Sequence, residues 1–158
     1  GAGDNTGGGE GAHDDPIPDP STISLKVIAK GKESLVAGEI WNKLPTASPP
    51  IGDTAAKGWS ATTVLDSSGQ YAALTAAGQK VDRLLLIDES GTSLFLAGDD
   101  LDPAKALPFL KLNRQGQLRF RLYRKTATSW EVAGDLRGVH TIEINPPEKG
   151  APPAKKAK

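Results

Sequence analysis

The chain has 158 residues and contains neither cysteine nor methionine. The absence of cysteine excludes disulfide bonds, thiol nucleophiles and metal sites with thiolate ligands. Histidine is scarce: there are two, and a zinc site needs more nitrogen ligands than one folded histidine supplies. His13 lies in a glycine-rich leader, and we expect His140 to be a hydrogen-bonded residue at the edge of the core, not a general base. We therefore expect no cofactor and no enzymatic activity.

An excess of charge and long apolar runs are missing too. The 19 basic and 19 acidic residues cancel, and aromatic residues make up 5% of the chain. Neither an electrostatic footprint nor a stacking platform for nucleic acid is present, so we expect no nucleic-acid partner. No apolar run approaches the roughly 18 residues of a membrane-spanning helix. We expect any lipid anchor to lie upstream of the chain.

The composition divides the chain into three parts. Residues 1–20 are dominated by Gly, Asp and Pro, and residues 146–158 by Pro, Ala and Lys. Such segments bury too little apolar surface to offset the entropy of ordering them, which predicts a disordered tether and a disordered tail around one domain at 21–145. The leader resembles the flexible segment after the lipid-attached cysteine of bacterial lipoproteins. This resemblance implies an extracytoplasmic location, in the periplasm or at the cell surface of a bacterium.

Within 21–145 the hydrophobic pattern is that of short strands separated by Gly, Asp and Pro turns. The predicted strands are 22–29, 35–41, 59–65, 70–74, 81–88, 92–97, a hairpin at 109–125, 129–133 and 139–144. Residues 42–58 form a long loop, and Asp102 followed by Pro103 predicts a single helical turn. The sequence therefore predicts an all-β fold, an antiparallel β-sandwich of the Ig-like or Greek-key type.

Two hairpins should supply most of the core. In 109–125 the apolar residues alternate at period 2, and Gly116 stands where the turn requires a positive φ. In 81–97 the runs at 84–87 and 94–96 are continuously apolar. Continuous runs predict strands that are covered on both faces, at the centre of the core.

Residues 62–78, TTVLDSSGQYAALTAAG, resemble the D-x-x-G-x-[YF] hairpin of carboxypeptidase-regulatory-like and transthyretin-like sandwich domains. Residues 36–40, VAGEI, are similar to the glycine-containing strand that opens those domains. The resemblance implies a seven-stranded Greek-key sandwich with a non-catalytic accessory role.

Charge is segregated along the second half of the domain. Residues 81–102 hold six acids and one base, whereas 103–130 hold seven bases and no acid. The alternation places Arg119, Arg121 and Tyr123 on one face, with Lys111 across from them. One interpretation is a binding patch for an anionic glycan, an envelope surface or an acidic protein. The other, which we favour, is that acidic and basic segments pair with each other.

The loop Asp99, Asp100 and Asp102 offers three carboxylates, the ligand type that Ca²⁺ prefers. It lacks EF-hand spacing and Asp102 is accounted for as a cap, so we favour a solvated acidic loop.

Taken together, the patterns favour a non-catalytic extracytoplasmic module for binding, adhesion or assembly, as a tethered lipoprotein or secreted accessory domain. Two alternatives remain open. One is a carboxylate-dependent or Ca²⁺-assisted polysaccharide hydrolase, which requires two acids of 81–102 to face each other in a groove. The other is a small inhibitor or carrier of a periplasmic protein.

Overall fold

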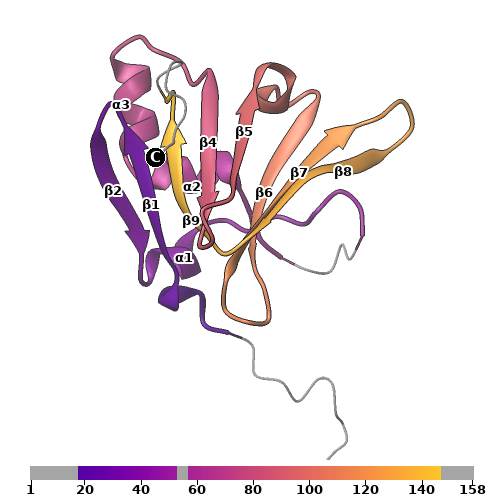
Figure 1. Cartoon of the computed structure of the whole chain (residues 1–158), viewed down its shortest axis with the longest axis horizontal. Coiled ribbons are helices and arrows are strands. Elements are labelled where there is room, and N and C mark those ends of the chain that lie inside the picture. Colours follow the sequence, from indigo (N-terminus) through magenta and orange to yellow (C-terminus); the bar gives the residue numbers. More distant parts are fainter. Residues whose placement is uncertain (1–17, 53–56, 147–158) are drawn as a thin grey trace, which may run out of the picture.

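The computed structural model describes residues 18–52 and 57–146. Most of the two predicted disordered segments, 1–17 and 147–158, lies outside the described residues. The described part is a β-rich, sandwich-like domain of two sheets with a few short helices (Figure 1). No helix in this part is both long enough and apolar enough to cross a membrane.

The first sheet has five strands in the order β2-β1-β9-β4-β5. Their bounds are Ser24–Ala29 (β1), Lys32–Ala37 (β2), Arg83–Asp88 (β4), Ser93–Ala97 (β5) and Val139–Ile144 (β9). β1 and β9 run parallel, so this sheet is mixed and not purely antiparallel as predicted. A parallel pair needs a long connection, and here nearly the whole domain connects the first strand to the last.

The second sheet has four strands in the order β3-β6-β7-β8. They span Trp59–Ser60 (β3), Ala106–Leu112 (β6), Leu118–Lys125 (β7) and Trp130–Arg137 (β8). β6 and β7 confirm the predicted hairpin, with Leu110 opposite Phe120 and Gly116 at φ 80° in the turn. Gly138, at φ 72°, connects β8 to β9 and so carries the chain from one sheet to the other.

The core lies between the inner faces of the two sheets. Every second residue points inward, as period 2 predicts: Leu25 and Val27, Leu84 and Leu86, Leu110, Phe120 and Ile142 are all buried. Trp41 and Trp59 also lie in this core.

Residues 61–67 and 70–76 are helical, so the strands predicted at 59–65 and 70–74 are wrong except for Trp59 and Ser60. After the two residues of β3 come α2 (Ala61–Ser67) and α3 (Gln70–Ala76), joined through Gly69 at φ 82°. Ala61, Val64 and Leu65 are buried at helical spacing. The run of β-branched residues at 62–64 favours a strand locally, but the three-and-four spacing of the buried residues determines the outcome. The hairpin on which the resemblance of residues 62–78 to carboxypeptidase-regulatory-like domains was based is therefore absent from the described structure.

Three smaller differences concern the ends of elements. The strand predicted at 35–41 ends at Ala37, and a short helix, α1 (Ile40–Lys43), follows. Asp102 accepts a hydrogen bond from the Ala104 amide at 3.0 Å, so the predicted cap and single turn are present, and β6 begins directly after them at Ala106, before the predicted start at 109. The 3-10 helix η3 (Gly98–Leu101) precedes it.

The prediction that β4 and β5 are covered on both faces is also wrong. β5 is an edge strand, and Phe95 is 53% exposed. The inner face of the sheet accepts Leu84, Leu86 and Leu96, while the alternate residues face the other side, where neither the second sheet nor α2 and α3 lie.

Candidate functional site

Three of the four predicted partner-binding residues share the outer face of the second sheet. Lys111 on β6 lies opposite Arg119 on β7, as predicted. Across the other edge of β7, Arg119 lies opposite Arg137 and Arg121 opposite Asp135. We call Lys111, Arg119, Arg121, Asp135 and Arg137 the Asp135 cluster. It contains four cations around one carboxylate.

Asp135 is the electrostatic centre of this cluster. It accepts two hydrogen bonds from Arg119, at 3.0 and 2.7 Å, and its Oδ2 lies 3.8 Å from Arg121 Nε. Hydrogen bonding by Arg119 holds the pKa of Asp135 below its ordinary value, against the opposing effect of partial burial, and the charge of Arg121 contributes in the same direction. The Arg121 Nε is buried without a hydrogen-bond partner in the described structure. The carboxylate therefore orients Arg119 but leaves Arg121 incompletely satisfied.

The fourth predicted residue, Tyr123, is not on an exposed basic face. Its side chain is 2% exposed and packs edge to face against Phe109, with ring centroids 6.0 Å apart. The loop after α1 covers this part of the sheet: Gly58, bridged to Ala47, lies directly against the Phe109 ring. A loop that is far away in sequence thus buries a position that alternation alone places in solvent.

Asp135 and Arg137 were missed by the sequence analysis. The charge count stopped at Trp130, although β8 continues to Arg137. Extending the alternation of the strand predicted at 129–133 by four residues would have placed both side chains beside Arg119 and Arg121.

The acidic loop pairs with the basic segment. Asp99 lies 3.3 Å from Lys105 Nζ, and Asp100 accepts a hydrogen bond from Arg124 at 2.7 Å. Asp102 caps the next turn. Within residues 18–52 and 57–146, no three His, Asp or Glu side chains gather closely enough to hold a metal ion. These three carboxylates are therefore engaged by cations and backbone amides, in the pattern that the pairing interpretation predicts.

His140 is exposed, not at the core edge. The pairing of β9 with β4 shifts register between Ile87 and Asp88, and the extra residue on β9 is His140. This bulge takes His140 out of the alternation that buries Ile142. Its Nδ1 lies 2.7 Å from the Thr141 hydroxyl.

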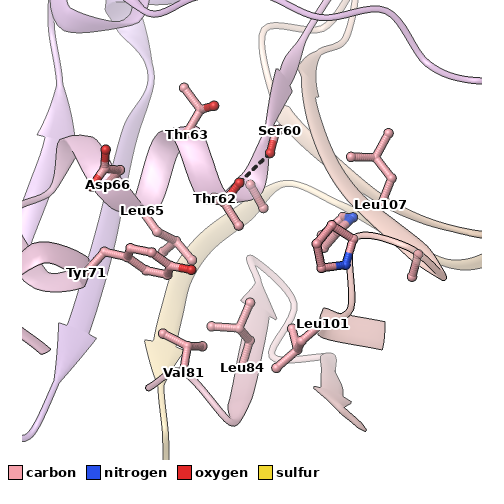
Figure 2. Close-up of a pocket in the computed structure, with 14 residues that line it drawn as sticks. Ser60, Thr62, Thr63, Leu65, Asp66, Tyr71, Val81, Leu84, Leu101 and Leu107 are labelled. Carbon is pink, nitrogen blue, oxygen red and sulfur yellow. Dashed lines mark hydrogen bonds between the residues drawn. The ribbon is translucent and has the colours of Figure 1, made fainter. Parts of the chain in front are cut away.

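A pocket of about 520 Å³ opens between the two helices and the segment that leads into β6 (Figure 2). Residues from six elements line it, because α2, α3, the start of β4, η3, β3 and β6 converge there. Its apolar lining includes Leu65, Val81, Leu84, Leu101, Leu107 and Pro108. In Figure 2, Leu65 and Tyr71 lie on one side of the cavity and Leu101 and Leu107 on the other. The size and lining fall within the range of small-molecule sites.

The polar groups of the pocket are few and mostly uncharged. Ser60 and Thr62 share a hydrogen bond of 2.7 Å between their hydroxyls. No described residue hydrogen-bonds to the Tyr71 hydroxyl, which leaves it available to a ligand. Asp66, which is exposed, is the one charged residue in the lining. The site offers apolar contact together with the four hydroxyl groups of Ser60, Thr62, Thr63 and Tyr71 for orientation.

Comparison of the chain with models of protein families, with curated proteins and with solved structures finds no match.

Proposed function

We propose that this chain is a non-catalytic binding module that holds an apolar small ligand in the pocket between α2, α3 and β6. The observation that carries the proposal is the pocket itself, in which aliphatic side chains from separate elements surround about 520 Å³. Each Å² of apolar ligand surface removed from water contributes about 25 cal/mol. The Tyr71 and Thr62 hydroxyls supply orientation.

The lining also favours binding over hydrolysis. A glycoside hydrolase of the usual kind needs two carboxyl groups on either side of the bond to be cleaved. Asp66 is the one carboxylate among the lining residues, and no histidine accompanies it. We therefore favour the binding module over the carboxylate-dependent hydrolase and over the inhibitor or carrier.

The location that we propose remains extracytoplasmic, through a tether at 1–20, on the composition of the leader. The finer assignment to carboxypeptidase-regulatory-like domains is not part of the proposal, because the residues that carried it form α2 and α3.

A second candidate is the recognition of an anionic glycan or an acidic protein surface by the Asp135 cluster. Its four cations outnumber its one carboxylate, and the Arg121 Nε has no described hydrogen-bond partner. An anion placed over Arg121 and Arg137 would complete the charge balance. The probe for this candidate is a dextran sulfate column. R121E/R137E should elute at lower salt than the equally charged K43E/K80E, and equal elution would exclude the cluster as the site.

The pocket is tested with 1-aminoanthracene, a neutral apolar fluorophore. Thr62 is exposed at the rim, so T62W places bulk over the opening without filling the core. We expect the probe to bind the natural chain and the affinity to fall about tenfold or more in T62W. The matched control is T128W, at an exposed threonine far along the chain, which should keep its affinity within about twofold. No saturable binding, or equal affinity in both variants, would reject the pocket as the site.

A further inference from the structure

The charge of the pocket between α2, α3 and β6 has one sign. Of the described residues that line it, Asp66 is acidic and none is basic. In Figure 2, Asp66 lies on the same side of the cavity as Leu65 and Tyr71. Asp66 is exposed, so its carboxylate stands at the opening and not in the apolar interior. A ligand whose polar end remains at the opening therefore meets a negative charge there.

The Asp66 carboxylate has no partner in the described structure. No described residue donates a hydrogen bond to it or forms an ion pair with it, and the last turn of α2 contains no basic residue. Two nearby acids are engaged, by contrast: Asp100 pairs with Arg124, and Asp102 caps the turn before β6. Asp66 is thus left to pair with a ligand.

The geometry of α2 places hydroxyl groups next to this carboxylate. Thr62 and Thr63 precede Asp66 by four and three residues, the spacing at which side chains of a helix are neighbours. Both threonines also line the pocket. An ammonium group has three hydrogen-bond donors and no acceptor. One carboxylate beside two hydroxyl oxygens suits such a group.

The same lining is less suited to ligands of other charge. A ligand carboxylate would meet no cation among the lining residues, and it would lie near Asp66, which has the same sign. A neutral polar end would form hydrogen bonds without charge pairing, and such bonds are weaker. Charge complementarity therefore favours a cationic end on an otherwise apolar ligand.

We propose that the ligand of the pocket is an apolar amine, whose hydrocarbon body occupies the cavity and whose ammonium group pairs with Asp66 at the opening. This inference rests on the proposed binding function of the pocket and adds the charge of the ligand. Because Asp66 is exposed, the pairing contributes modestly to the affinity and mainly distinguishes ligands of equal apolar size.

The probes are octylamine, 1-octanol and octanoate, which share one alkyl chain and differ in the charge of the end group. Each is titrated at neutral pH and low salt into the full chain with 1-aminoanthracene bound, and displacement of the fluorophore gives its affinity. We expect octylamine to bind about threefold more tightly than 1-octanol, and octanoate about threefold more weakly. The difference should shrink at high salt, because exposed charges are screened.

Substitutions at Asp66 separate the role of the carboxylate from that of the cavity. D66N should bind octylamine and 1-octanol with affinities equal to within about 1.5-fold, and D66K should prefer octanoate to octylamine. D82N is the matched control, because Asp82 is an exposed aspartate next to Val81 that does not line the pocket. It should keep the preference for octylamine. Circular dichroism of each variant verifies the fold.

The results distinguish the ligand class from the pocket itself. Equal affinities of octylamine and 1-octanol for the natural chain, tighter binding of octanoate, or a preference for octylamine that D66N retains would overturn the amine assignment and leave the pocket as a binding site. Failure of 1-aminoanthracene and 1-octanol to bind at all would instead reject the pocket, and the amine assignment with it.

Discussion

Trp41 and Trp59 meet edge to face in the core, with ring centroids 4.9 Å apart and planes at 61°. Their indole N–H groups differ. Trp41 donates to the carbonyls of Ile23 and Val36 at 3.2 and 3.1 Å, whereas the Trp59 N–H has no hydrogen-bond partner in the described structure. The two rings occupy similar space, but only one of them ties the start of the domain to β2.

This difference predicts unequal costs for the same substitution. Trp41→Phe leaves two buried carbonyls without their donor, whereas Trp59→Phe removes no hydrogen bond. We expect Trp41→Phe to lower the free energy of unfolding by about 1 to 3 kcal/mol more than Trp59→Phe does. Urea denaturation of both variants measures the difference. Equal losses would mean that the Trp41 hydrogen bonds contribute nothing net.

Gly58 is predicted to be the least replaceable glycine outside the turns. A Cβ there would lie 2.3 Å from the Leu110 carbonyl oxygen and 2.7 Å from the Phe109 ring. Gly58→Ala should therefore cost about 3 kcal/mol, because backbone cannot move aside. Gly134→Ala is the matched control. Its Cβ would lie 2.9 Å from the end of the flexible Leu94 side chain and in ordinary contact with the Leu122 Cβ at 3.5 Å, so this substitution should cost clearly less in thermal unfolding. The reverse order would contradict the packing described for the loop over Phe109.

Removal of the Asp135 carboxylate should destabilise the second sheet. Asp135→Asn weakens both hydrogen bonds to Arg119 and leaves four neighbouring cations unbalanced. Because the pair is partly exposed, we expect a loss of about 1 kcal/mol in urea denaturation at low salt. The loss should decrease in high salt as the cations are screened. Glu131→Gln, on an exposed position of the same strand, controls for the removal of a negative charge. A loss that is the same at both salt concentrations would indicate packing, not charge.

The same pair predicts a pH dependence. Arg119 lowers the pKa of Asp135 in the folded state, so the unfolded chain takes up the proton first as the pH falls. The stabilisation is complete above the unfolded pKa of about 3.9 and disappears as the pH passes below the folded value. The stability difference between the natural chain and Asp135→Asn should thus be constant from neutral pH to about pH 5 and then shrink. A difference that persists unchanged in acid would show that the ion pair is not its source.

Glu143 should behave in the opposite sense. Burial raises its pKa, so the folded chain holds the proton more tightly and the carboxylate costs stability once the pH exceeds its ordinary value of 4.5. Glu143→Gln should therefore be at least as stable as the natural chain at neutral pH and lose this advantage on acidification. A clear loss of stability at neutral pH would instead show that the carboxylate has a partner within the chain.

The sequence predicts the parts of the fold that depend on local patterns. Period 2 and Gly116 are sufficient for the hairpin of β6 and β7, because one face of it packs on a core. Local patterns do not predict the helices α2 and α3. Thr62, Thr63 and Val64 have strand propensity, and the burial of Ala61, Val64 and Leu65 at helical spacing, which overrides that propensity, depends on tertiary contacts.

The candidate sites were harder to predict from the sequence, because they too depend on contacts between distant segments. Alternation placed Lys111, Arg119 and Arg121 correctly. It failed for Tyr123, because a distant loop covers that position. It also failed for His140, because a bulge adds a residue to β9. The pocket is formed by six separate segments, and no single segment carries its signature.

The central claim is that the pocket between α2, α3 and β6 is the binding site. Chemical-shift mapping of the isotope-labelled chain with 1-aminoanthracene tests it most directly. The account predicts saturable shifts at the amides of Thr62, Thr63, Leu65, Tyr71 and Leu101, with those of Arg121 and Glu143 unchanged. Shifts centred on the outer sheet face or on the Asp135 cluster, or none up to the solubility limit of the probe, would contradict it.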